Sequence, residues 1–211
     1  MKFVLIHGAF GNINNHWLLN LKKRLENTNQ QVLYVQFPVD NWDDMTQRGL
    51  NAPPINQSLE SWLNTYEAKI YPYINKRDQI SFVGHSLGPL FTLHVVNKFN
   101  LKLESAIFVA PFLEKLNKSW QIDNANSSFY KKDFDFKKLK NLIPDSFSLF
   151  SENDPYVDEK YSLNFAEKMN SKIIKIKGAK HLNSEIGLLD FSLVFELCKT
   201  RIDYSSISST S

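Results

Sequence analysis

Short, uninterrupted apolar runs recur along this chain, separated by segments long enough to hold a helix. Six such runs consist mostly of β-branched, aromatic and leucine residues, at 3–6, 32–37, 80–83, 105–110, 147–150 and 172–176. Apolar runs of this length without polar alternation are typical of strands that are buried on both faces. The pattern therefore predicts a sheet that is covered on both sides.

The segments between these runs space their apolar residues as helices do. The spacing predicts helices over about 15–27, 58–70, 87–99, 158–169 and 187–199. Because strands that alternate with helices pair in parallel, we expect the α/β class, with a mostly parallel six-stranded sheet and helices on both faces. We expect a single domain over residues 1–200 and a flexible tail over residues 201–211, which end in SSISSTS.

Two longer segments do not follow this alternation. Residues 40–57 are polar, include two consecutive prolines, and are expected to form a loop. Residues 111–145 are rich in aromatic side chains and longer than a usual connection, which is typical of a lid or a small additional element. A surface helix that packs Phe134, Leu139 and Ile143 onto the sheet explains the second segment equally well.

The charge balance and the single cysteine restrict the classes of protein to consider. The 211 residues contain 25 Lys and Arg against 22 Asp and Glu, and this net charge of +3 gives no basis for a nucleic-acid partner. Cys198 has no partner for a disulfide within the chain, as in proteins of reducing compartments. No apolar stretch approaches the roughly 18 residues of a membrane span. We therefore expect a cytoplasmic protein without a membrane span.

The sequence from Gly84 to Gly88 reads Gly-His-Ser-Leu-Gly and stands between a predicted strand and a predicted helix. This is the pattern of a nucleophile elbow, in which a sharp strand-to-helix turn exposes a serine hydroxyl above the edge of the sheet. The two glycines allow the backbone to pass close to its neighbours. The pattern predicts Ser86 as a catalytic nucleophile, and an ordinary glycine-serine turn is the alternative.

A serine hydroxyl needs an adjacent base to act as a nucleophile. His181 follows the sixth predicted strand, so it should lie at the same sheet edge as Ser86, because parallel strands end there together. His85 is next to Ser86 on the elbow, and its side chain should diverge from the hydroxyl. The other histidines end the first strand or lie in helices: His7, His16 and His94. We therefore predict His181 as the base.

The third member of such a triad is an acid that fixes the imidazole tautomer. The turn after the fifth predicted strand reads Ser-Glu-Asn-Asp-Pro-Tyr-Val, and Asp154 within it is the expected acid. Glu152 and Asp158 are the alternatives. The chain order Ser86, Asp154, His181 is that of α/β-hydrolases and differs from the orders of trypsin-like and subtilisin-like proteases.

Acyl transfer also needs donors for the negative charge that develops on the substrate oxygen. The backbone N–H of Leu87, directly after the nucleophile, is one expected donor. The other should come from the loop after the first strand, between His7 and Gly11, where Ala9 is the expected residue. These two donors complete the predicted constellation.

Four stretches, LIHGAFGNINNHW, GHSLG, SENDPYV and GAKHLNSE, together resemble the small serine hydrolases of the YdeN type, which are related to retinoblastoma-binding protein nine. The resemblance runs from about residue 2 to residue 199. It implies a compact α/β-hydrolase fold that lacks the first strands of larger members. It also implies the triad Ser86, Asp154 and His181, which agrees with the assignment made from the residues.

The resemblance further implies that Trp17 lies near the mouth of the site. We also expect Phe10, Trp17, His85 and Phe112 to contact the substrate. Related sequences tend to have a glycine directly before the triad histidine, where this chain has Lys180.

These residues predict a serine hydrolase that works through an acyl-enzyme on Ser86, and the resemblance implies small esters or amides as its substrates. His181 must be neutral to accept a proton, so activity should fall below about pH 6–7. One alternative is a non-enzymatic module that binds another protein on a hydrolase scaffold, because a fold does not fix a function. A lyase or acyltransferase that uses the same triad is another. We expect no cofactor and no metal, since the sequence contains no motif for either.

Overall fold

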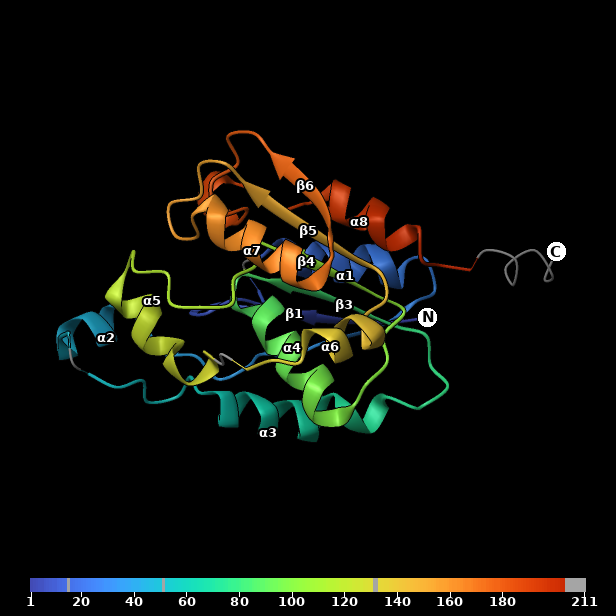
Figure 1. Cartoon of the computed structure of the whole chain (residues 1–211), viewed down its shortest axis with the longest axis horizontal. Helices are drawn as coiled ribbons and strands as arrows, with labels where there is room; N and C mark the ends of the chain where they lie inside the picture. Colours follow the sequence, from blue (N-terminus) through green and yellow to red (C-terminus); the bar gives the residue numbers. More distant parts are fainter. Residues whose placement is uncertain (15, 51, 131–132, 204–211) are drawn as a thin grey trace.

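The computed structural model describes residues 1–14, 16–50, 52–130 and 133–203 (Figure 1). Within these ranges six parallel strands form one sheet in the order β2-β1-β3-β4-β5-β6. The strands are β1 (Lys2–Ile6), β2 (Gln31–Tyr34), β3 (Ile80–His85), β4 (Ser105–Val109), β5 (Ser146–Ser151) and β6 (Lys172–Ile176). The predicted six-stranded parallel sheet is confirmed.

Helices cover both faces of this sheet, as predicted (Figure 1). The α-helices are α1 (Trp17–Glu26), α2 (Trp42–Arg48), α3 (Leu59–Lys69), α4 (Leu87–Phe99), α5 (Trp120–Ala125), α6 (Phe136–Leu142), α7 (Glu159–Met169) and α8 (Ser192–Lys199). Short 3-10 turns form η1 (Tyr71–Tyr73), η2 (Ser127–Phe129) and η3 (Ser184–Ile186).

Two hydrophobic cores attach the helices to the sheet, because neighbouring residues on a strand point to opposite faces. In β1, Val4 and Ile6 belong to the core under α3, α4, α6 and α7. Phe3 and Leu5 belong to the core under α1 and α8. All four side chains are fully buried, which is why the strand reads as an uninterrupted apolar run.

The strand order reverses between β1 and β3. The chain runs outward from β1 to β2 through α1 and then returns past β1 to β3. Open parallel sheets bind their ligands at such a reversal, outside the carboxyl ends of the strands. His7 and Gly8 follow β1 at this point, and Ser86 follows β3. The fold therefore brings the loop after the first strand next to the predicted nucleophile.

The second strand is shorter than the predicted run over 32–37 and ends at Tyr34. Beyond it, the Phe37 N–H donates to Nε2 of His7 at 3.0 Å instead of to a neighbouring strand. The end of the apolar run therefore supports the loop after β1 and does not extend the sheet.

The last helix begins at Ser192, later than the predicted start near Gly187. Gly187 has a φ of 70°, a left-handed conformation that ends the turn η3 and interrupts any continuous helix. In the segment that follows, Asp190 pairs with Arg24 of α1 at 2.8 Å.

The segment 40–57 contains α2, although the sequence predicted a loop there. Asn41 caps this helix, because its side-chain oxygen accepts a hydrogen bond from the Asp44 N–H at 3.0 Å. The buried carboxylate of Asp40 accepts hydrogen bonds from the backbone N–H groups of residues 55–57 at 2.8 to 3.3 Å. These contacts close the segment on itself.

The segment 111–145 contains both a helix packed onto the core and a small additional element, the two alternatives that the sequence left open. Its second half forms α6, whose Leu139 packs with Phe134 and Ile143 in the core beside α4 and α7, in agreement with the surface-helix interpretation. Its first half forms α5, which lies beside α2 at one end of the molecule (Figure 1). Helices α2 and α5 thus form a small additional element.

The predicted tail begins with residues that are packed against the rest of the protein. Ile202 is buried in the core under α8, and Arg201 pairs with Asp145. The later part of the predicted tail, residues 204–211, lies outside the described residues. Within the described ranges, no helix combines the length and the apolar character that crossing a bilayer requires.

Candidate active site

Ser86 lies in the tight turn that joins β3 to α4. Its φ of 59° and ψ of −105° lie outside the regions that L-residues favour, so the turn holds this residue in a strained conformation. The Ser86 N–H donates to the Val109 carbonyl oxygen at 2.8 Å, which anchors the turn to β4. Ser86 is partly exposed, whereas its neighbours His85 and Leu87 are buried. This is the geometry of a nucleophile elbow.

The glycines of the motif are required by close approaches of the backbone. A Cβ on Gly88 would lie 2.5 Å from the carbonyl oxygen of Ile6 in β1. A Cβ on Gly84 would lie 2.7 Å from the carbonyl carbon of Gly88. Both distances are far shorter than a van der Waals contact between carbon and its neighbours. The two positions therefore need glycine for steric reasons as well as for the turn.

His181 and Asp154 form a hydrogen-bonded pair near this turn, and their residues are 6% and 7% exposed. Nδ1–H of the imidazole donates to Oδ2 of the carboxylate at 2.7 Å. The other oxygen, Oδ1, accepts from the backbone N–H groups of Tyr156 (2.8 Å) and Val157 (3.0 Å). Because the carboxylate holds the proton on Nδ1, Nε2 of the neutral ring is left as the basic atom.

The two alternative acids lie elsewhere. Asp158 directly precedes α7 and pairs with Lys118 at 2.8 Å. Glu152 is exposed, and the carboxylate that contacts the imidazole belongs to Asp154. The geometry therefore favours Asp154 over both.

Tyr156 packs against the imidazole and joins two loops. Its ring meets the His181 ring edge-on, with 5.1 Å between the centroids. Its hydroxyl donates to Oε1 of Glu185 at 3.0 Å. Burial, together with the Glu185 carboxylate, raises the pKa of Tyr156 to about 12, so the hydroxyl remains a donor at neutral pH. The loop that carries Asp154 is thereby tied to the turn that follows His181.

The expected oxyanion donors lie at the two loops that meet at the strand reversal. The Leu87 N–H is the first of α4, so it has no acceptor within the helix and lies at the positive end of the helix dipole. Ala9 follows β1 and lines the cavity described below. The neighbouring Phe10 N–H already donates to Oε1 of Gln57 at 3.3 Å, which leaves Ala9 as the better second donor.

His7 holds the loop after β1 in place. Its Nδ1–H donates to the Gly8 carbonyl oxygen at 2.7 Å, and its Nε2 accepts from the Phe37 N–H at 3.0 Å. These partners fix one neutral tautomer, because a carbonyl can only accept and a backbone N–H can only donate. Burial lowers the pKa of His7 to about 4, against the opposing effect of the bond to Gly8.

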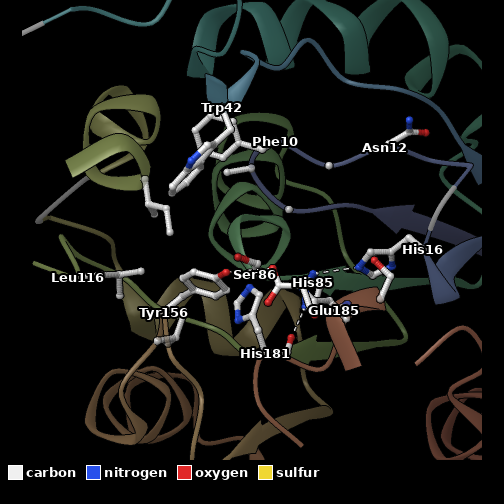
Figure 2. A pocket seen from close by; sticks show the side chains of 17 residues that line it. Phe10, Asn12, His16, Trp42, His85, Ser86, Leu116, Tyr156, His181 and Glu185 are labelled. Atoms are coloured by element: carbon white, nitrogen blue, oxygen red, sulfur yellow. Dashed lines mark hydrogen bonds between the residues drawn. The ribbon is translucent and has the colours of Figure 1, made fainter. Parts of the chain in front are cut away.

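His85 bonds to its neighbours and not to Ser86. Its Nε2–H donates to the His181 carbonyl oxygen at 2.8 Å, and its Nδ1 accepts from Nε2–H of His16 at 3.2 Å (Figure 2). Burial is the main reason why the pKa of His85 is well below its usual value and that of His16 falls to about 3. Repulsion between neighbouring histidines adds to both shifts, so both rings are neutral at neutral pH.

A cavity of about 390 Å³ is lined by both Ser86 and His181. Much of its wall is apolar or aromatic and consists of Phe10, Trp42, Leu116, Ile122, Tyr156 and Val157. Other lining side chains are polar: Asn12, His16, Asn183, Ser184 and Glu185. In Figure 2 the labelled members of the first group lie on one side of the pocket, and Asn12 and His16 lie on the other.

Ser86 and His181 both line this cavity, and both are labelled in Figure 2. Among the residues that the structure describes, no hydrogen bond joins the Ser86 hydroxyl to this ring, whose side-chain partner is Asp154. Serine–imidazole hydrogen bonds are often long or poorly aligned before a substrate binds. Rotation about the Cα–Cβ bond of Ser86 changes the direction of the hydroxyl without any movement of the backbone.

Two residues that were expected to contact the substrate do not line the cavity. Trp17 is fully buried against His85, and its Nε1–H donates to the Leu182 carbonyl oxygen at 2.9 Å. Phe112 is fully buried in the core beside α4. The expected contacts of Trp17 and Phe112 with the substrate are therefore wrong, because both side chains pack inside the protein. Trp17 does lie close to the site, since its ring packs against those of His16 and His85, which line the cavity. Phe10 and His85 do line the cavity.

The sequence did not predict most of the apolar residues that line the cavity. Trp42 begins α2 and packs edge-on against Phe10, with 5.2 Å between the ring centroids. A signal for this helix exists, since Asn41 is a typical N-cap and two acidic residues follow in the first turn. Leu116 and Ile122 carry no comparable local signal, because their positions depend on how α5 packs beside α2.

The sequence profile of a family described as "Serine hydrolase" matches residues 3–199. The chain belongs to the serine hydrolase family. The match extends from β1 to the end of α8, so it includes every residue of the site described above. Membership supports a hydrolase activity for the protein.

Solved structures share the fold of this serine hydrolase. The ydeN gene product from B. subtilis has a TM-score of 0.76 and 21% identity, over 95% of this chain and 97% of that chain. Est1E from Butyrivibrio proteoclasticus with ferulic acid bound has a TM-score of 0.64 and 15% identity, over 94% and 86% of the two chains. A monoacylglycerol lipase from Paleococcus ferrophilus has a TM-score of 0.63 and 13% identity, over 95% of each chain.

The resemblance to the YdeN type is confirmed by these comparisons. At such identities the likeness to each structure concerns the fold alone. Among curated proteins, none matches the sequence of this serine hydrolase.

Proposed function

We propose that this protein hydrolyses small esters or amides through an acyl-enzyme on Ser86, with His181 as the base and Asp154 as the acid that orients it. The hydrogen bond of 2.7 Å between Nδ1 of His181 and Oδ2 of Asp154 carries the proposal. A carboxylate on Nδ1 selects the tautomer in which Nε2 can take a proton, and it stabilises the imidazolium that then forms.

In the proposed reaction, Oγ of Ser86 attacks the substrate carbonyl carbon while Nε2 of His181 accepts the hydroxyl proton. The imidazolium gives this proton to the leaving alcohol or amine, and the acyl group remains on Ser86 as an ester. Water, deprotonated by the same imidazole, then attacks the ester and releases the carboxylic acid. The backbone N–H groups of Leu87 and Ala9 stabilise the oxyanion in both steps.

The cavity supports an apolar acyl group of modest size. Its volume of about 390 Å³ falls near the lower end of small-molecule pockets. Its aromatic and aliphatic wall suits an acyl chain or ring that makes no strong polar contacts. Structures with the same fold include Est1E with ferulic acid bound and a monoacylglycerol lipase, so aromatic and aliphatic esters are the classes to test first.

A chain-length series of p-nitrophenyl esters, from acetate to decanoate, tests the proposal on the wild type and on Ser86→Ala. We expect kcat/KM to peak at an intermediate length, and we expect Ser86→Ala to lose at least about 10³-fold at every length. A matched p-nitroanilide series then distinguishes esterase from amidase activity. Hydrolysis at the same rate by both proteins would contradict Ser86 as the nucleophile. Hydrolysis by neither above background would favour the non-enzymatic binding module.

A further inference from the structure

The backbone of the loop that carries His181 adopts unfavourable dihedral angles. Lys180, directly before the histidine, has a φ of 44°, and Leu182, directly after it, has a φ of 53°. The left-handed region favours glycine, and side chains there cost free energy. Such residues persist only where surrounding contacts hold them. The position of His181 therefore depends on the groups that bind this loop.

The last residue of β5 and the loop after it supply two of these contacts. Oγ of Ser151 accepts a hydrogen bond from the Ala179 N–H at 2.9 Å. Oδ1 of Asn153 accepts one from the Lys180 N–H at 2.9 Å. Both contacts bind residues that precede His181, so they fix the backbone before the histidine and not the histidine itself.

Two further contacts come from α1 and from the elbow, in addition to the bond of 3.0 Å that the Leu182 N–H donates to the Ala179 carbonyl within the loop. Nε1–H of Trp17 donates to the carbonyl oxygen of Leu182 at 2.9 Å. Nε2–H of His85 donates to the carbonyl oxygen of His181 at 2.8 Å. Of all these bonds, the one from His85 acts on the main chain of the base itself, and it comes from the residue next to the nucleophile.

His85 is in turn held by His16 through a chain of hydrogen bonds that allows only one proton arrangement. The His181 carbonyl can only accept, so the proton of His85 is on Nε2 and its Nδ1 accepts from Nε2–H of His16 at 3.2 Å. Nδ1 of His16 accepts in turn from the Leu18 N–H at 3.3 Å. We call this chain of hydrogen bonds, from the Leu18 N–H through the neutral rings of His16 and His85 to the carbonyl of His181, the relay.

The relay keeps this arrangement at all pH values near neutrality. A second proton on His16 would sit on Nδ1 and face the Leu18 N–H, so two donors would point at each other. A second proton on His85 would sit on its Nδ1 and face Nε2–H of His16 in the same way. Burial and the neighbouring histidines His7 and His181 disfavour that proton as well, so the pKa values of both rings lie far below their usual value.

We propose that His16 and His85 are positioning residues for His181. His85 binds the main-chain carbonyl of His181, His16 orients His85, and Asp154 binds the His181 ring. The inference rests on the proposed function, because it needs His181 to be the base. Two anchors, one on the backbone and one on Nδ1, fix the direction of Nε2. A misplacement of about 1 Å in such a group can cost about 10²-fold in rate.

Two substitutions of similar shape at His85 separate this role from simple packing. In His85→Gln the side-chain amide can still donate to the His181 carbonyl, whereas in His85→Met the donor is lost and the volume is similar. We expect kcat of His85→Met to fall about 10- to 100-fold, with KM within about twofold because His85 is only 3% exposed. We expect His85→Gln to keep kcat within about threefold of the wild type.

His94 provides a matched control. It is also a buried histidine whose Nε2–H donates to a main-chain carbonyl, that of Phe129 at 2.7 Å, but it lies on α4 away from the cavity. The pair His94→Gln and His94→Met should therefore change the urea midpoint of unfolding and leave kcat unaltered. If His85→Met does not fold, the pair His16→Gln and His16→Met tests the same relay one step further from the base.

The outcomes distinguish this inference from the proposed function. Equal kcat values for His85→Met and His85→Gln, or an equal loss of kcat in the His94 pair, overturn the positioning role. If the wild type itself gives no Ser86-dependent ester hydrolysis, the proposed function fails first. A loss of kcat restored by glutamine only at His85 is the result that the relay predicts.

Discussion

Gly8 lies so close to Ser86 that a Cβ on Gly8 would stand 2.8 Å from the Cβ of the serine and 3.3 Å from its Oγ. The two residues follow β1 and β3, which are neighbours in the sheet although 78 positions separate Gly8 from Ser86 (86 − 8). The loop that carries the expected oxyanion donor is therefore in direct contact with the nucleophile.

Gly8→Ala should consequently damage the site. The added methyl group forces the loop after β1 away from Ser86, and a displacement of about 1 Å can cost about 10²-fold in kcat/KM. Overpacking of this kind also costs about 1–3 kcal/mol in the free energy of unfolding. Ester hydrolysis and urea unfolding measure the two effects, and a variant with wild-type kcat/KM would contradict the close contact.

Asp154→Asn should preserve the fold and lower kcat. The amide oxygen can still accept from the Tyr156 and Val157 N–H groups, whose bonds to Oδ1 measure 2.8 Å and 3.0 Å in the wild type. The amide nitrogen, however, donates to Nδ1 of His181 and so selects the tautomer whose Nε2 carries a proton. We expect kcat to fall about 10³- to 10⁴-fold with little change in the unfolding midpoint. An activity within tenfold of the wild type would assign the orienting role to another group.

The histidines with lowered pKa values make the stability of the folded protein depend on pH. His7 and His16 have pKa values lowered by burial from 6.5 to about 4 and about 3, so between about pH 6.5 and 4 the unfolded chain binds protons that the folded protein does not. The free energy of unfolding must then decrease as the pH falls through this window, by up to about 1.4 kcal/mol per pH unit for each histidine.

Urea titrations at several pH values between 7 and 4.5 measure this slope. His16→Gln removes one of the titrating groups and should make the slope shallower. A stability that does not change between pH 7 and 4.5 in the wild type would show that these histidines are not held neutral.

Trp42 should determine how long an acyl chain the enzyme accepts. Its side chain lines the cavity, is 38% exposed, and packs against Phe10. Trp42→Ala removes apolar surface that a longer chain would cover, so we expect KM for octanoate to rise about tenfold and KM for acetate to change little. Tyr73→Ala is the matched control, since Tyr73 is an exposed aromatic residue that does not line the cavity. If Trp42→Ala changed KM equally for the octanoate and acetate esters, other residues would determine the preferred chain length.

The sequence was sufficient to predict those features whose signals are local. The apolar runs predicted the strands, because the inner strands β1, β3 and β4 are buried on both faces and such strands are rich in apolar residues. The elbow was readable at Gly84–Gly88, since the turn demands glycine at fixed offsets from the serine. The positions of Asp154 and His181 were predictable because each lies in the loop that follows a strand, and all strands of a parallel sheet end at the same edge.

Features that depend on contacts between distant segments could not be predicted in this way. Trp17 faces inward because its indole N–H bonds the carbonyl of Leu182, 165 positions away. Trp42 lines the cavity because α2 packs beside α5, and nothing near Trp42 in the sequence indicates that partner. The relay from His16 to His85 joins residues 69 positions apart.

The central claim is that Ser86 is a nucleophile activated by His181, and covalent labelling tests it most directly. The protein is incubated with a fluorophosphonate probe, and its mass and the modified peptide are then determined by mass spectrometry. The account predicts one adduct per chain on Ser86, absent in Ser86→Ala and formed more slowly in Asp154→Asn. Labelling at another residue, labelling that persists in Ser86→Ala, or no adduct at all would contradict it.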